Sequence, residues 1–110
     1  MINKDFFKKI RILDGGMGQE LLARGMKPNS TLWSANAILD ANYHQLVLDT
    51  HVDFIKAGAE VIVTTTFATR QKRLKENNLL DKFEYLNQKA GEIAQAAKQI
   101  FPNTYIAGGI

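Results

Sequence analysis

The sequence contains no cysteine and only two histidines among its 110 residues. These counts exclude a disulfide framework and any metal site built from cysteine thiolates of this chain alone. No apolar run approaches the roughly 18 residues that cross a bilayer, so we expect no transmembrane helix and no membrane partner. The first ten residues carry charges throughout and do not resemble a secretory signal peptide. We therefore expect a cytoplasmic protein.

Glycine and proline are also scarce, at 8 and 2 residues, which excludes collagen-like and low-complexity classes. Hydrophobic residues make up 45% of the chain and charged residues 23%, a balance typical of a folded globular domain. The formal net charge is +3, and the basic stretch 70–75 is best interpreted as a solvated helix face. We expect no nucleic-acid partner.

Short apolar runs alternate with stretches of helical periodicity. Three runs are typical of strands, at 10–14, 61–65 and 104–107. Apolar side chains three and four positions apart predict helices at 18–24, 43–57, 69–76 and 81–100. Such alternation predicts an α/β domain with a parallel sheet and right-handed crossovers. Three strands cannot pair both sheet edges, so we expect part of a larger α/β domain.

The turn after the first predicted strand carries the first candidate site. Asp14 stands at the carboxyl end of that strand, where ligands bind in α/β folds. Gly15 and Gly16 let a ligand approach the backbone, and N–H groups near a helix start favour a carboxylate. A carboxylate beside free N–H groups could grip both ends of an amino acid. The alternative interpretation is a tight strand-to-helix turn that Asp14 caps.

Two later segments carry candidate pocket residues. Thr65 and Thr66 end the second predicted strand, where hydroxyls can hydrogen-bond a ligand and Phe67 can form a wall. On pattern alone, β-branched residues there are more commonly structural. Trp33 lies in a loop between helices, where it either lines a pocket or fills the core, the commoner role of a lone tryptophan.

Two further patterns give no site. His44 and His51 are seven positions apart, which is not the i, i+4 spacing of a helical metal pair. We expect both to be surface or partly packed side chains. The dinucleotide-binding fingerprint also fails, because its third glycine, counted from Gly16, falls on Leu21.

An ordered set of short motifs along nearly the whole chain resembles the homocysteine S-methyltransferase family. Its members are Leu13-Asp14-Gly15-Gly16-Met17-Gly18 with Glu20-Leu21, Leu32-Trp33-Ser34, His51, Ala57-Gly58-Ala59-Glu60-Val61-Ile62, Thr64-Thr65-Thr66-Phe67 and Ile106-Ala107-Gly108-Gly109-Ile110. The order of these motifs makes the resemblance specific.

The resemblance implies a (β/α)8 TIM barrel, a fold that typically needs about 250 residues. Residues 1–110 would form the first three βα units of this homocysteine-binding domain. The implied reaction moves a methyl group from a sulfonium, ammonium or folate donor to the zinc-bound thiolate of homocysteine, giving methionine. Zinc would lower the pKa of the thiol. The family's zinc ligands are cysteines from later strands, so we expect this chain alone to be inactive.

The resemblance also implies roles for single residues. Asp14 matches the family carboxylate that binds the substrate amine, and Gly15 and Gly16 match backbone near the amino-acid end of the substrate. Ala68 differs from relatives that have tyrosine or glutamine there, which leaves the methyl donor open. The positions that line the family's pocket are matched by Trp33, Thr65, Thr66 and Phe67.

Two other hypotheses stay open. The chain could be a non-catalytic barrel fragment that pairs its exposed sheet edges in a homo-oligomer. It could instead be a small phosphate- or nucleotide-binding α/β protein that uses the glycine turn at 15–18. A nucleotide that raises the melting temperature would favour this last hypothesis.

Overall fold

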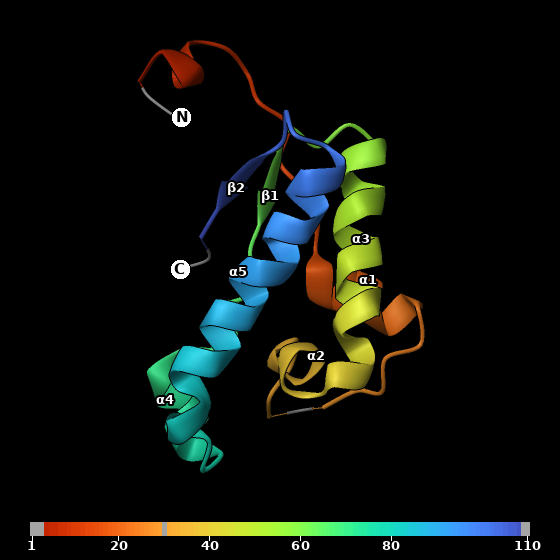
Figure 1. Cartoon of the computed structure of the whole chain (residues 1–110). Helices are drawn as coiled ribbons and strands as arrows, with labels where there is room; N and C mark the ends of the chain where they lie inside the picture. Colours follow the sequence, from red (N-terminus) through yellow and green to blue (C-terminus); the bar gives the residue numbers. More distant parts are fainter. Residues whose placement is uncertain (1–3, 30, 109–110) are drawn as a thin grey trace.

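The computed structural model describes residues 4–29 and 31–108 (Figure 1). Its elements, in chain order, are η1 Lys4–Lys8, α1 Met17–Ala23, α2 Ala35–Leu39, η2 Ala41–Tyr43, α3 His44–Lys56, β1 Val61–Val63, α4 Gln71–Glu76, η3 Leu80–Lys82, α5 Phe83–Ile100 and β2 Tyr105–Ala107. Helices α3 and α5 pack against each other and against the two strands. The arrangement is the predicted α/β fold with helices beside a parallel sheet.

The sheet is parallel, as the sequence predicts, with Val61 opposite Tyr105 and Val63 opposite Ala107. The run at 10–14 contributes only a single parallel bridge, between Leu13 and Val61, so it is shorter than the predicted strand. The backbone explains this difference. The N–H groups of two successive residues, Glu60 and Val61, both donate to the carbonyl of Ile12, and a regular ladder does not continue through such a pair.

The helix boundaries follow local signals. Before α3, the carboxylate of Asp40 accepts a hydrogen bond from the N–H of Asn42 at 3.0 Å and so caps η2. After α3, Gly58 has a φ of +118°, a conformation that favours glycine. Helix α2 was not predicted, because five residues are too few to show a helical period. Its Ala37 and Ile38 are nevertheless fully buried.

The main core lies between the helices. Its fully buried side chains come from α1, α2, α3, α4 and α5, and include Leu21, Ile38, Val47, Leu74 and Leu86. A second cluster joins α5 to the sheet, where Ala94 and Ala97 pack on Ile62 of β1. Because these alanines are small, α5 can approach the middle of β1 closely. Within the described ranges, no helix is long and apolar enough to cross a membrane.

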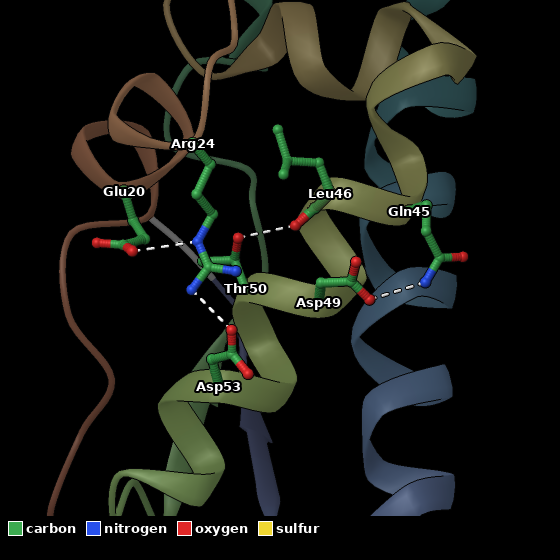
Figure 2. A network of polar contacts seen from close by, with 7 residues as sticks. All are labelled: Glu20, Arg24, Gln45, Leu46, Asp49, Thr50 and Asp53. Atoms are coloured by element: carbon green, nitrogen blue, oxygen red, sulfur yellow. Dashed lines mark hydrogen bonds and ion pairs between the residues drawn. The ribbon is translucent and has the colours of Figure 1, made fainter.

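A polar network joins α1 to α3 (Figure 2). The guanidinium of Arg24 donates from Nε to Glu20 at 3.1 Å and pairs through Nη2 with Asp53 of α3 at 2.8 Å. The hydrogen bond to Asp53 is the main cause that raises the pKa of Arg24. Ion pairs this exposed contribute about 0–1 kcal/mol each. These ion pairs matter for the position of α1, because they connect it, and the glycine turn before it, to α3.

Two glycines give a matched test of the backbone. Gly58→Ala is expected to lower the free energy of unfolding by about 1–2 kcal/mol, because alanine is strained at a φ of +118°. Gly91→Ala, in the middle of α5, is expected to raise it by about 0.5–1 kcal/mol, because alanine favours helix. A new Cβ meets no atom within 4 Å at either site, so packing does not contribute. Urea unfolding followed by circular dichroism measures the free energy of unfolding of both variants. Changes of the same sign would contradict the different backbone conformations of Gly58 and Gly91.

Candidate functional site

A cleft of about 530 Å³ opens where β1 and the segment before α1 end. Three pieces of chain meet there: the turn from Asp14 into α1, the loop before α2, and the residues after β1. The residues expected from the sequence that line it are Asp14, Gly15, Gly16, Trp33, Thr65 and Phe67. The fold therefore brings together residues that are up to half the chain apart. Thr66, which was also expected, does not line the cleft.

Asp14 is the carboxylate of the cleft wall, and the backbone of β1 holds it in place. Its N–H donates to the carbonyl of Val61 at 3.0 Å, and its Oδ2 accepts from the N–H of Val63 at 3.0 Å. Partial burial raises the pKa of Asp14, and the Val63 hydrogen bond opposes that rise. A carboxylate has about four acceptor positions, so capacity remains for a ligand. The site thus offers a fixed acceptor for a cationic group.

The glycine turn brings bare backbone to the cleft. A Cβ on Gly15 would lie 2.9 Å from Cε1 of Phe54, so a side chain there would push the turn away from α3. Gly16 stands at the N-cap of α1 and supplies no side chain to cap the helix. The first N–H groups of a helix have no partner within it. This turn therefore brings bare backbone and the start of α1 to the same cleft as Asp14.

Of the residues that follow β1, Thr65 and Phe67 line the cleft, whereas Thr66 shapes the turn. Thr65 is only 4% exposed, and its hydroxyl has no hydrogen-bond partner among the described residues. Leaving a buried hydroxyl unpaired costs about 1–3 kcal/mol, which a bound ligand could offset. Thr66 instead shapes the turn, because its N–H donates to the carbonyl of Thr64 and its own carbonyl accepts from Thr69. Phe67 is 58% exposed and forms part of the wall.

Trp33 lines the cleft and does not fill the core. It is 57% exposed, so the core-filling interpretation is wrong. The neighbouring Leu32 takes the buried position instead, where it packs with Ala35 and Ala68. Asn29 also lines the cleft and was missed by the sequence analysis. Its only signal was the turn-forming Pro28-Asn29 pair, which predicts a loop but not a role.

The two histidines do not line the cleft. His44 is partly packed, with Nε2 2.7 Å from the carbonyl oxygen of Ile38, as expected. His51 is fully buried, so its expected surface or partly packed position is wrong. The reason is that α3 is covered on several sides, by α1, by α5 and by β1. Among the described residues, no three His, Cys, Asp or Glu side chains gather as a metal site.

Comparison with known proteins adds a family to this geometry. The family model described as homocysteine S-methyltransferase matches residues 11–110. The chain belongs to the homocysteine S-methyltransferase family. The match contains all three pieces of chain that form the cleft.

Individual relatives agree with this assignment. The chain is similar to homocysteine S-methyltransferase 2 of Saccharomyces cerevisiae, with 30% identity over 94% of this chain and 34% of the relative. Homocysteine S-methyltransferase 2 of Zea mays is 36% identical over 82% of this chain and 26% of its own length. The chain thus spans about a quarter to a third of the length of these curated relatives.

A solved structure supports the fold. The crystal structure of the homocysteine methyltransferase MmuM from Escherichia coli, in its metallated form, superposes with a TM-score of 0.77 at 27% identity. The similarity covers 92% of this chain and 38% of that one. The arrangement of helices and parallel strands is therefore shared with a family enzyme.

Proposed function

We propose that the cleft binds the amino-acid end of homocysteine, as part of an enzyme that transfers a methyl group to its sulfur and forms methionine. The observation that supports this most directly is the carboxylate of Asp14, held at the cleft wall by the N–H of Val63. A fixed carboxylate suits an ammonium group. Family membership supports the choice of homocysteine over other amino acids.

The other cleft residues have complementary roles in this proposal. Gly15 brings bare backbone to the cleft, and the N–H of Gly16, at the N-cap of α1, suits the substrate carboxylate. The unpaired hydroxyl of Thr65 offers one more hydrogen bond. Trp33 and Phe67 supply apolar walls of the cleft, and these suit the uncharged part of the homocysteine side chain. These residues bind and orient the substrate.

The zinc ion that the resemblance implies does not fit the residues of this chain. The sequence has no cysteine, and the part of the chain that the structure describes forms no cluster of three ligands. Zinc ligands would have to come from outside these 110 residues. We further propose that residues 1–110 form the first part of a (β/α)8 barrel, whose later strands would supply them.

One experiment tests the proposed function. Homocysteine is incubated with a sulfonium, an ammonium or a folate methyl donor, and methionine is measured by mass spectrometry. The polypeptide in which these residues occur naturally is compared with the 110-residue chain alone. We expect methionine from a polypeptide of the relatives' length and none from the 110 residues. If the 110-residue chain alone forms methionine, the proposal that it needs residues from outside these 110 is wrong. If the longer polypeptide forms no methionine with any of the three donors, the proposed function is wrong.

A second candidate function is a non-catalytic fragment that self-associates. Its supporting observation is an apolar segment beside the sheet, where Ile10 is 92%, Ile12 54% and Leu13 61% exposed. Apolar residues at an unpaired sheet edge favour pairing with another chain. Sedimentation of the 110-residue chain tests this. A homo-oligomer supports it, and a monomer that unfolds cooperatively contradicts it.

A further inference from the structure

We propose that Arg73 is a positioning residue that holds Trp33 at the wall of the cleft. This inference rests on the proposed function, because Trp33 matters only if the cleft binds a substrate. Arg73 belongs to the basic stretch 70–75, for which the sequence predicts a solvated helix face. Lys72 and Lys75 in that stretch are exposed, as expected, but Arg73 is partly buried.

The contacts of Arg73 reach from α4 to the loop that carries Trp33. Its Nη1 donates to the carbonyl of Thr31 at 2.9 Å, across 42 positions of sequence. Its guanidinium carbon lies 6.0 Å from the centre of the Trp33 ring, within the range of a cation–π contact. Its Nε is buried with no hydrogen-bond partner among the described residues. A purely solvated arginine would keep that donor in water, so these contacts indicate a structural task.

Trp33 needs such a support because little else fixes it. Its φ of +53° lies in the left-handed region, which costs a non-glycine residue about 1–2 kcal/mol. More than half of its surface is exposed, so core packing does not hold the ring. The N–H of Trp33 donates to the carbonyl of Asn29 at 3.0 Å, which fixes the backbone. The position of the ring is then set by its contact with Arg73.

The side chain of Asn29 stabilises the loop that carries Trp33. Oδ1 of Asn29 accepts hydrogen bonds from the N–H groups of Thr31 at 3.1 Å and Leu32 at 2.8 Å. These bonds are local and connect the loop only to itself. The bond from Arg73 ties the same loop to α4, which begins four residues after Phe67. Arg73 therefore couples two walls of the cleft, the loop of Trp33 and the segment of Phe67.

The chemistry of this contact is specific to arginine. A planar guanidinium can donate a hydrogen bond in its plane while its face lies near an aromatic ring. A lysine ammonium has the same charge but lacks the planar fork. We therefore expect Arg73→Lys to keep the fold and lose much of the positioning. Lys72→Gln is the matched control, because it removes one charge from the next position on the same helix.

The spectroscopic test uses the fact that Trp33 is the only tryptophan of the 110-residue chain. Its fluorescence is quenched with acrylamide in the chain and in the Arg73→Lys, Arg73→Gln and Lys72→Gln variants, with Trp33→Phe as the background. Because Trp33 is already 57% exposed, we expect the quenching constant to rise about 1.5-fold in both Arg73 variants and to stay unchanged in Lys72→Gln. Circular dichroism checks the helical content of each variant. Unchanged quenching in folded Arg73 variants would overturn the proposal.

A kinetic test separates this inference from the proposed function. In the naturally occurring polypeptide, Arg73→Lys is expected to raise KM for homocysteine or the methyl donor about fivefold with kcat little changed, because the pocket wall is no longer preorganised. Equal KM values in Arg73→Lys and wild type would contradict the role of Arg73. If no methyl transfer is found at all, the proposed function fails, and quenching still decides whether Arg73 positions Trp33. Loss of helical structure in both Arg73 variants, but not in Lys72→Gln, would assign Arg73 to folding and contradict the proposal.

Discussion

Asp14→Asn is expected to weaken the binding of homocysteine about 10–150-fold, the effect of losing a hydrogen-bonded charge worth about 1.5–3 kcal/mol. The side chain keeps its size and an oxygen that can still accept from the N–H of Val63. The variant therefore removes the negative charge at the cleft wall and little else. An ammonium group would then lie beside a neutral amide, which binds it less strongly.

The same substitution is expected to leave the fold as stable as before, or slightly more stable, at neutral pH. Burial raises the pKa of Asp14 above its ordinary value, so the folded protein holds this proton more tightly than the unfolded chain does. Above the unfolded pKa, the charged side chain therefore costs stability, and that cost shrinks as pH falls. Replacing it with a neutral amide removes the cost. A substitution that weakens binding without lowering the stability of the fold identifies a residue whose role is in binding.

Calorimetric titration with homocysteine and urea unfolding measure the two effects. The control is Asp49→Asn on α3, an exposed carboxylate that accepts a hydrogen bond from Gln45 and does not line the cleft (Figure 2). This control should bind like the wild type. The role of Asp14 is contradicted if both variants bind alike, or if Asp14→Asn loses binding only because it is unfolded.

His51→Leu is expected to remove a pH-dependent loss of stability that amounts to about 3 kcal/mol in the wild type. Burial lowers the pKa of His51 to about 4, so the folded protein keeps this ring neutral where the unfolded chain takes up a proton. Stability therefore falls as pH drops from about 6.5, the ordinary pKa of histidine, to about 4. Neither ring nitrogen has a hydrogen-bond partner among the described residues, so leucine leaves no neighbour unpaired.

Urea unfolding at a series of pH values between 7 and 4 measures this effect. The difference between wild type and His51→Leu isolates the histidine, because carboxylates titrate in both proteins. His44→Gln, at the other histidine of the chain, should keep the slope that His51→Leu loses. Parallel curves for the wild type and His51→Leu would show that His51 does not cause the loss.

The sequence predicted the elements whose signals are local and long. The face of α5 repeats apolar residues at helical spacing, and Leu86, Ala90 and Ile93 are buried as that spacing requires. Gly58 ended α3 through its own backbone preference. The run 61–65 gave the position of β1, although only Val61–Val63 pairs as a strand.

The errors concern properties that depend on the rest of the fold. Trp33 and Leu32 are both apolar and adjacent, and nothing in the local pattern tells which one is buried. His51 is buried in a helix, α3, that packs against α1, α5 and β1, and this packing cannot be read from the residues around position 51. The sequence does not distinguish Arg73 from the lysines near it, because the hydrogen bond to Thr31 that sets it apart crosses 42 positions. Asp14, Gly15 and Phe67 were found because strand ends are local signals, and parallel strands end at one edge.

The bond between Asp14 and the N–H of Val63 joins residues 49 positions apart, and this separation has a consequence during synthesis. At about 5–20 residues per second, a ribosome needs about 2–10 seconds to add the intervening chain. Until β1 leaves the exit tunnel, Ile12 and Leu13 have no strand to pair with and are open to other nascent chains. The carboxylate proposed for substrate binding thus gains its partner on β1 late in synthesis, and until then Ile12 and Leu13 stay accessible to chaperones that bind apolar nascent segments.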